Sequence, residues 1–239
     1  MATTTFWQQL HATWPIGGPA KAPFSDSYPV RLPGGRILVL PLRALPDGTH
    51  AVASLIANQA SFEVVDALSA AMTDLARLDA PDLIIGLPTL GLTFAPRIAE
   101  ALGHTRYVPL GTSRKFWYDD ALSEPIASIT SPGITAAARK AIYLDPNLRP
   151  LLSGQRVTVV DDAISSGTSM LSALRLLRRL DVEIASVVVA MKQTTHWQPA
   201  LAAFDPEMPK RVKAVYGCPL FTRGDGGWVP LPESMPMVP

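Results

Sequence analysis

A short segment that joins an apolar run to a helix sets the strongest constraint on how this chain folds. Residues 157–160 (VTVV) are typical of a buried strand, and Asp161 and Asp162 follow them directly. Small residues fill the turn at 163–167, and a helix with one apolar face is expected from Thr168 onward. A strand, a tight turn and a helix in this order predict an α/β domain with a mostly parallel sheet.

The same turn has the chemistry of a site for a phosphorylated sugar. Exposed amides at a helix N-terminus, together with the hydroxyl groups of Ser165 and Ser166, suit a phosphate. Gly167 lets the backbone approach a ligand closely. Carboxylates do not bind phosphate, so Asp161 and Asp162 suit sugar hydroxyls and a divalent metal. A plain strand-to-helix turn with polar caps accounts for the serines but leaves two adjacent acids unexplained.

The composition of the 239 residues fits one large α/β domain and argues against several other classes. Hydrophobic residues make up 48% and charged residues 17%, which suits a large buried core. A net charge of +1 argues against general nucleic-acid binding, and the single cysteine, Cys218, excludes an intrachain disulfide. The sequence has no GxxxxGKS/T or GxGxxG motif and no metal-ligand spacing of histidines. It also lacks a membrane-length apolar run and a secretory signal, so a cytoplasmic location is expected.

Further apolar runs and amphipathic segments repeat the strand–helix alternation along the chain. We expect strands at 36–42, 83–87, 106–110, 156–160, 183–191 and 211–216, and helices at 59–78, 94–102 and 168–180. The chain divides into an N-terminal arm (1–58), an α/β core (59–204) and a C-terminal strand with a Pro/Gly-rich tail (205–239). Residues 111–142 form an unusually long connection, which is typical of a functional loop or a small subdomain.

Residues 157–169 resemble the 5-phosphoribosyl-1-pyrophosphate (PRPP) motif of type I phosphoribosyltransferases, with Ser166-Gly167 in place of the usual Thr-Gly. The likeness extends over roughly residues 28–200 and is greatest to adenine phosphoribosyltransferases. It implies a twisted sheet with helices on both faces, and a small hood with strands in residues 1–58. Asp161 and Asp162 would hold the ribose hydroxyls and Mg²⁺. The PRPP-binding residues implied are Asp161, Asp162, Ala163, Ile164, Ser165, Ser166, Gly167, Thr168 and Ser169.

A second loop follows the strand expected at 83–87, at the strand end where ligands of open α/β sheets collect. By resemblance this loop binds pyrophosphate and has a non-proline cis peptide at Pro88–Thr89. Taken alone, the segment reads equally well as the proline-capped start of a helix. Adenine enzymes have an arginine where this chain has Leu90, so one pyrophosphate contact is expected to be missing. The pyrophosphate-binding residues implied are Pro88, Thr89, Leu90, Gly91 and Lys115.

A basic pair precedes a run of aromatic residues at the start of the long connection. By resemblance, Arg114 and Lys115 close over the leaving group and supply the charge that Leu90 lacks. A solvent-exposed pair before a surface loop is the alternative interpretation. Residues 116–118 (FWY) would exclude water from the activated ribose, but packing of the hood or a contact in a homodimer accounts for them equally well.

Recognition of the acceptor is the least determined part of the predicted site. By resemblance the base contacts the hood strand at Arg36, Ile37 and Leu38. The acidic residue that is usual in that strand is replaced here by the apolar region of Leu40 and Pro41. Glu124 is the candidate for proton transfer, with Asp119 and Asp120 as rivals. The catalytic residues implied are Arg114, Lys115, Glu124 and Asp162.

These features predict a Mg²⁺-dependent enzyme that transfers the 5-phosphoribosyl group of PRPP to a nitrogenous base, by resemblance a purine, and releases pyrophosphate. A nucleobase-like small molecule and a second copy of the chain are the expected partners, without nucleic acid or a membrane. Leu90 and the altered hood strand leave a second hypothesis open, a non-catalytic PRPP sensor on the same fold. A PRPP-using enzyme with a different kind of acceptor is a third.

Overall fold

The computed structural model describes residues 9–14, 21–126 and 140–238. The core is a five-stranded sheet with the order β10-β9-β8-β4-β5, and every neighbouring pair in it is parallel. Its strands are β4 (Leu83–Gly86), β5 (Val108–Pro109), β8 (Arg156–Ile164), β9 (Glu183–Gln193) and β10 (Val212–Cys218). Continuous apolar runs such as VVVAM in β9 suit strands covered on both faces. The predicted α/β class is confirmed.

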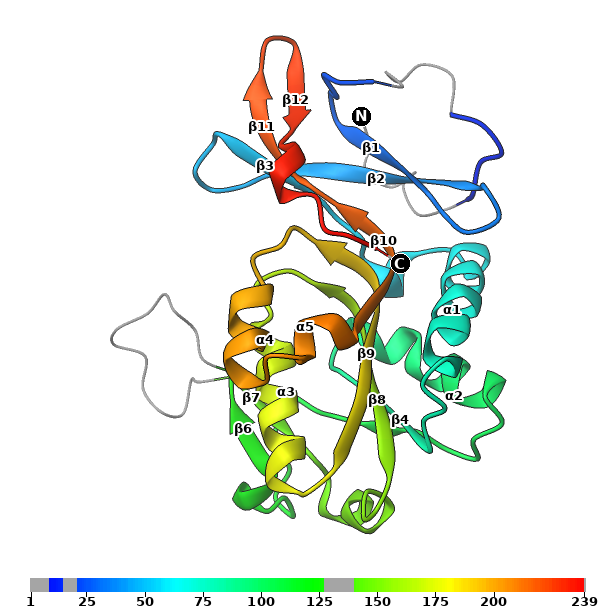
Figure 1. Cartoon of the computed structure of the whole chain (residues 1–239), viewed down its shortest axis with the longest axis vertical. Coiled ribbons are helices and arrows are strands. Elements are labelled where there is room, and N and C mark those ends of the chain that lie inside the picture. Colours follow the sequence, from blue (N-terminus) through cyan, green and yellow to red (C-terminus); the bar gives the residue numbers. More distant parts are fainter. Residues whose placement is uncertain (1–8, 15–20, 127–139, 239) are drawn as a thin grey trace.

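Helices cover both faces of the core sheet, as Figure 1 shows. They are α1 (Phe62–Arg77), α2 (Ala95–Ala101), α3 (Thr168–Arg179), α4 (Gln198–Phe204) and α5 (Met208–Arg211). Alternate residues of β8 belong to two different buried clusters. Val160 lies in the cluster that includes residues of α1 and α2. Val159 lies in the cluster that includes residues of α3, α4 and α5. The hydroxyl of Ser61 caps α1 by accepting the Val64 N–H at 3.3 Å. Each face of the sheet is therefore closed by its own apolar core.

A second five-stranded sheet forms the hood above the carboxyl ends of the core strands (Figure 1). Its strands are antiparallel, in the order β1-β2-β3-β11-β12. They are β1 (Ser27–Arg31), β2 (Ile37–Ala44), β3 (His50–Ala53), β11 (Leu220–Gly224) and β12 (Gly227–Pro230). The Gln193 side chain at the end of β9 donates to the Ala53 carbonyl at 2.6 Å, which ties the core sheet to the hood.

The hood takes strands from both ends of the described chain. The sequence predicted hood strands only within residues 1–58 and left the tail after 217 open. In the structure β11 and β12 form a hairpin around Asp225-Gly226, and Phe221 of β11 pairs with Ala51 of β3. A two-residue Asp-Gly connection is a strong hairpin signal, and Gly226 has the positive φ, +83°, that such turns need.

Shorter elements complete the described part of the chain. β6 (Ser123–Pro125) and β7 (Ala141–Tyr143) form a two-stranded antiparallel sheet on either side of residues 127–139. The described 3₁₀ helices are η2 (Ala57–Gln59), η3 (Leu90–Thr93), η4 (Asp120–Leu122), η6 (Pro146–Leu151) and η7 (Pro232–Ser234). Residues 127–139 of the connection predicted at 111–142 lie outside the described residues.

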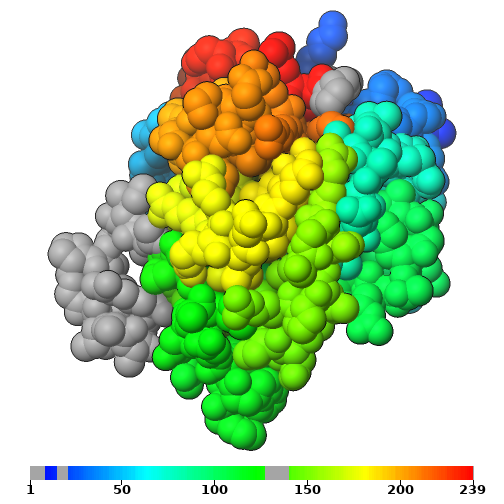
Figure 2. Space-filling model, turned by 60° about the horizontal axis from the view of Figure 1, so that its bottom comes forward, coloured from blue at the N-terminus to red at the C-terminus, as the bar shows by residue number. Residues whose placement is uncertain are grey.

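The view in Figure 2 shows α3 between the β6 segment and the α4–α5 segment, in agreement with the packing of α3 against β6 and α4. One side of α3 is thus covered by the connection that precedes it in the sequence, and another by the helices that follow. Among the described helices, none combines the length and the apolar character that a membrane span requires.

Candidate active site

The end of β8 carries the two acids that the sequence singled out. The predicted boundary of this strand at Val160 was wrong, because β8 continues to Ile164. Pairing with β9 persists beyond the boundary, with Asp161 opposite Val189 and Ile164 opposite Lys192. Hydrogen bonds to a neighbouring strand hold these residues extended, and a side-chain pattern does not reveal them. The acids, expected at the end of the strand, therefore lie within it, and so do the first two residues of the turn predicted at 163–167.

The turn after β8 encloses a hollow of about 150 Å³. Gly167 has a φ of +77° and lies against Trp197, where an added Cβ would come 3.1 Å from the Trp197 Cβ. The glycine offers no side-chain cap to α3, and the Thr168 N–H donates to the Ser166 Oγ at a long 3.4 Å, so other amides of the first helical turn remain available to an anion. The hydroxyl oxygens of Ser166 and Thr168 lie 2.9 Å apart beside them. The hollow is lined by Asp161, Ala163, Ile164, Ser165, Ser166, Gly167, Thr168, Ser169 and Met170.

Asp161 and Asp162 are two carboxyl groups held side by side in a poorly solvated place. Burial raises the pKa of Asp161 well above its ordinary value, and the neighbouring charge of Asp162 raises it further. Burial also raises the pKa of Asp162, against the opposing effect of hydrogen bonds from its surroundings. Because both pKa values are raised, the pair favours a proton, a cation or a hydroxyl donor over two free negative charges.

The donor set at the end of β8 suits a Mg²⁺ ion that is shared with a phosphorylated ligand. Mg²⁺ is usually bound through one or two carboxylates while water and substrate phosphates fill its other positions. Asp161 and Asp162 supply two carboxylates next to the phosphate-sized hollow. No cluster of three or more acids, histidines or cysteines exists among the described residues, so a site made of protein ligands alone is not found there.

The raised pKa of Asp161 predicts how stability without ligand varies with pH. An acid whose pKa is higher in the folded state stabilises the fold below its unfolded-state pKa, near 3.9, and loses that contribution as pH rises through the folded value. Above pH 4 the free energy of unfolding should therefore fall for the wild type relative to Asp161→Asn, by at most about 1.4 kcal/mol per pH unit. Urea unfolding with a chelator at several pH values measures this, with exposed Asp74→Asn as the control. A difference that does not vary with pH would contradict the prediction.

The second predicted loop lies directly against the two acids. Its peptide Pro88–Thr89 is cis, which confirms the sequence-based prediction. Gly91 packs on β8 so closely that an added Cβ would lie 2.6 Å from the Val160 carbonyl oxygen and 3.0 Å from Asp161 Oδ1. Leu90 begins the short helix η3, which also contacts β8. The structure thus places loop 88–91 against Asp161, which lines the hollow, at the carboxyl ends of β4 and β8.

The basic pair lies on the exposed connection between β5 and β6. The Arg114 Nε donates to Asp120 Oδ1 at 2.7 Å, and Lys115 is exposed. Asp120, a rival for proton transfer, is therefore engaged in an ion pair. Phe116 is 91% exposed, and Trp117 is held by a 3.2 Å hydrogen bond from its Nε1 to Asp145 Oδ2. The basic pair is therefore exposed, as are the side chains of Phe116 and Trp117.

Glu124 is placed away from the other predicted site residues. It lies in β6 and forms an ion pair with Arg179, at the C-terminal end of α3. The hollow lies at the N-terminal end of the same helix, eleven residues earlier at Thr168. At 1.5 Å per residue, Arg179 lies about 16 Å along the helix from Thr168, and Glu124 is not among the residues that line the hollow. The structure does not bring Glu124 together with the phosphate hollow.

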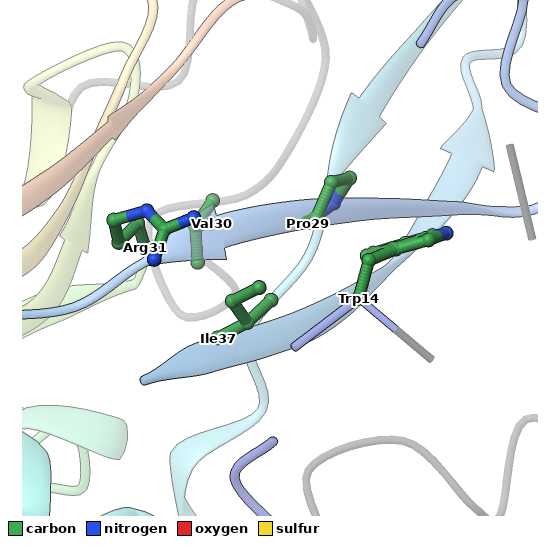
Figure 3. A pocket seen from close by; sticks show the side chains of 5 residues that line it. All are labelled: Trp14, Pro29, Val30, Arg31 and Ile37. Atoms are coloured by element: carbon green, nitrogen blue, oxygen red, sulfur yellow. The ribbon is translucent and has the colours of Figure 1, made fainter. Parts of the chain in front are cut away.

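The predicted base-binding residues lie at the start of β2. The Arg36 guanidinium forms an ion pair with Glu63 in the first turn of α1. Leu38 is fully buried in the cluster that joins the hood to the core. Ile37 borders a separate hollow of about 230 Å³ in the hood. Figure 3 shows the residues that line it, Trp14, Pro29, Val30, Arg31 and Ile37.

One charged residue at the edge of the site was not among the predicted ones. Lys192 lies near the end of β9, opposite Ile164 of β8, and is only 6% exposed. Burial lowers the pKa of its amino group. A lysine directly after the apolar run VVVAM was the signal in the sequence, because charged residues are rarely fully buried without a partner.

The comparisons with known proteins agree with this geometry. The family model of the phosphoribosyl transferase domain matches residues 51–207, whereas the curated proteins yield no match to the sequence. Similar solved structures include adenine phosphoribosyltransferase from Rhodothermus marinus, at 15% identity and a TM-score of 0.54, covering 80% of this chain and 94% of that one. The enzyme from Thermoanaerobacter pseudethanolicus has 20% identity and a TM-score of 0.51, with coverages of 66% and 87%.

The enzyme from Trypanosoma brucei, solved in complex with AMP, pyrophosphate and ribose-5-phosphate, has 16% identity and a TM-score of 0.50, and 65% of each chain is covered. At these identities the structural likenesses show a shared fold. The family model carries the assignment, because it spans more than half of the sequence and includes both loops of the site. The chain therefore belongs to the phosphoribosyl transferase domain family of enzymes.

Proposed function

We propose that the chain transfers the 5-phosphoribosyl group of PRPP to a purine-like nitrogenous base and releases pyrophosphate. The observation that carries this proposal is the phosphate-sized hollow at the start of α3, with Asp161 and Asp162 beside it. A phosphate cradle next to acceptors for sugar hydroxyls fits a ribose 5-phosphate. The purine class rests on the fold shared with adenine phosphoribosyltransferases.

Different residues at the carboxyl ends of β4 and β8 bind different parts of the donor. Amides and hydroxyl groups of residues 165–169 bind the 5-phosphate, and the N-terminal end of α3 favours its negative charge. Asp161 and Asp162 accept hydrogen bonds from the ribose hydroxyls and supply the carboxylates for Mg²⁺. An ion held by these carboxylates would supply positive charge near the pyrophosphate.

Positioning and electrostatics are sufficient for this chemistry, without a covalent intermediate. Loop 88–91 holds the pyrophosphate through its backbone, beside Asp161. The apolar hood covers the carboxyl edge and keeps water from the reactive C1. Positive charge that develops at C1 is balanced by the nearby carboxylates, and the acceptor nitrogen is held within reach.

Lys115 is expected to act on the departing pyrophosphate, late in the reaction. Lys115→Ala should then lower kcat by roughly 10²-fold and change PRPP affinity much less, because a contact made only in the transition state leaves ground-state binding intact. Steady-state kinetics with calorimetric titration of PRPP separate the two quantities. Lys210→Ala on α5 is the matched control. Equal losses in kcat and in affinity would show a role in ground-state binding instead.

A pyrophosphate-release assay tests the proposed function. The protein is incubated with PRPP, Mg²⁺ and a panel of purines, pyrimidines and related heterocycles, and the nucleotide product is identified by mass spectrometry. Turnover of a purine supports the proposal. PRPP binding without turnover of any base would favour the sensor hypothesis, whose sequence basis is Leu90 in the pyrophosphate loop. Turnover of another kind of acceptor would support PRPP as the donor and would show that the acceptor is not a purine.

A further inference from the structure

The turn that joins β9 to α4 packs against the residues that form the phosphate hollow. Its last residue, Trp197, directly precedes α4, and the Trp197 side chain is only 1% exposed. A Cβ added to Gly167 would come 3.1 Å from the Trp197 Cβ and 3.4 Å from the Trp197 Cα. Gly167 lines the hollow and directly precedes α3. The backbone that opens the hollow is therefore in close contact with the backbone of Trp197.

The apolar interior next to the hollow also contains Trp197. Ile164 and Met170 line the hollow on either side of Gly167 in the sequence, and both belong to the buried cluster that includes Trp197. By residue volume, Trp197 is the largest fully buried side chain among the described residues. Figure 1 shows α4 beside α3, in agreement with the contacts between the two helices. One apolar cluster therefore supports the end of β8 and the start of α3.

A hydrogen bond to a strained residue orients the Trp197 ring. The Trp197 Nε1 donates to the Thr194 carbonyl at 3.0 Å, in a buried position. Thr194 has a φ of +58°, in the left-handed region that β-branched residues rarely adopt. Its N–H donates to the Cys218 carbonyl at 2.9 Å, and its Oγ1 accepts the His196 N–H at 3.3 Å. Three hydrogen bonds therefore hold a strained residue in the conformation that meets the indole.

We propose that Trp197 is a positioning residue for the 5-phosphate, which holds Gly167 and the first turn of α3 where their amides meet the ligand. This inference rests on the proposed function. The Cα and Cβ of Trp197 face Gly167, and the buried indole with its hydrogen bond determines where these two atoms lie. Ordinary core packing accounts for the buried ring, but it does not require a strained partner. Strain of this kind gathers where a ligand site must be held in one geometry.

Trp197→Phe tests the role in binding. It keeps the atoms that face Gly167 but removes the N–H donor and part of the ring, so these atoms lose their anchor. The Kd of ribose 5-phosphate and the KM of PRPP should each rise about tenfold, because small displacements of a positioning group weaken its contacts by this order. The kcat should change much less, since the 5-phosphate is held alike in the ground state and the transition state. The Kd of pyrophosphate, which loop 88–91 holds in the proposed function, should stay unchanged.

Calorimetric titrations and steady-state kinetics measure these quantities. Trp228→Phe is the matched control, because it makes the same substitution at a buried tryptophan of the hood, which is 7% exposed. This control should change neither Kd. Equal losses of affinity for ribose 5-phosphate and pyrophosphate in Trp197→Phe would overturn the inference, because they would indicate a general structural role.

Hydrogen exchange of the free protein tests the positioning without any ligand. The Leu171 N–H donates to the Gly167 carbonyl at 2.8 Å, so its exchange rate reports opening of the first turn of α3. This rate should rise about tenfold in Trp197→Phe. The Val65 N–H, which donates to the Ser61 carbonyl at the start of α1, is the internal control and should exchange as in the wild type.

A second variant separates the hydrogen bond from the volume of the ring. Benzothienylalanine in place of Trp197 keeps the shape of the side chain and removes the N–H donor, so the fold is retained. The exchange rate of Leu171 and the Kd of ribose 5-phosphate should then rise about threefold, as for the loss of one hydrogen bond. Unchanged exchange of Leu171 in both variants would overturn the inference. Faster exchange, in a protein whose wild type binds no ribose 5-phosphate, would reject the proposed function while the hold of Trp197 on α3 stands.

Discussion

The double variant Asp161→Asn, Asp162→Asn is expected to unfold at a higher temperature than the wild type while losing nearly all PRPP binding. Burial raises the pKa of both groups, and the charge of Asp162 raises that of Asp161 further, so neutral amides of the same shape relieve a cost that the free protein carries at neutral pH. For a chain of this size, each 1 kcal/mol gained raises the Tm by about 2–4 °C. The same change removes the proposed ligands for the ribose hydroxyls and Mg²⁺, so kcat/KM for PRPP should fall by ~10³-fold or more.

Calorimetry without ligand and titration with PRPP and Mg²⁺ measure the two effects on the same protein. Asp74→Asn on the exposed face of α1 is the control for a carboxyl-to-amide change, and it should alter neither quantity. A lower Tm together with weaker binding would indicate that the acids have a structural role. Retained PRPP binding in the double variant would remove the site assignment.

Gly91→Ala is expected to impair both stability and PRPP binding, although it adds a single methyl group. The new Cβ would lie 2.6 Å from the Val160 carbonyl oxygen and 2.8 Å from the Asp161 Cα, and these backbone atoms belong to a paired strand. Loop 88–91 must move away from β8 to relieve the overlap, at a cost of about 1–3 kcal/mol in the free energy of unfolding. Its amides then leave the place where they meet pyrophosphate.

The matched control is Gly111→Ala, because no atom lies within 4 Å of a Cβ at that position and its φ is not in the left-handed region. Denaturant unfolding and PRPP titration of the two variants compare the effects directly. We expect kcat/KM for PRPP to fall by ~10²-fold in Gly91→Ala, because a misplaced positioning element reduces turnover by this order. Equal behaviour of the two variants would show that the loop has room to adjust without consequence.

The core sheet could be predicted from the sequence because its strands are continuous apolar runs bounded by turns. The run 183–191 and the helix that begins at Thr168 were found nearly at their observed bounds. The end of β8 was missed, since acids and small residues follow Val160 and only pairing with β9 keeps them extended. The second half of the hood was missed for a similar reason. Its strands are short and rich in glycine and proline, and they are defined by partners far away in sequence.

The hollow of the candidate site could be predicted from the sequence because one local segment contains the polar groups that line it. Residues 161–169 are contiguous, so the strand, turn and helix that contain them bring their groups together. The cis peptide at Pro88–Thr89 followed from resemblance, because no residue-level rule requires it. The partners of the Glu124 and Lys192 side chains depend on tertiary packing instead. A local pattern does not show that the first pairs with Arg179, or that the second donates to the Met237 carbonyl.

The two-ended hood also sets the order in which this enzyme is completed. β3 can pair with β11, Ala51 with Phe221, only after nearly the whole core between them in the sequence has been synthesised. The parallel strands β8 and β9 are joined by one helix, so their contacts close a much shorter loop and form earlier. During synthesis the core sheet that carries the candidate site is therefore expected to form before the hood is complete. The growing chain therefore passes through a stage in which the candidate site has formed but is not yet covered by the hood.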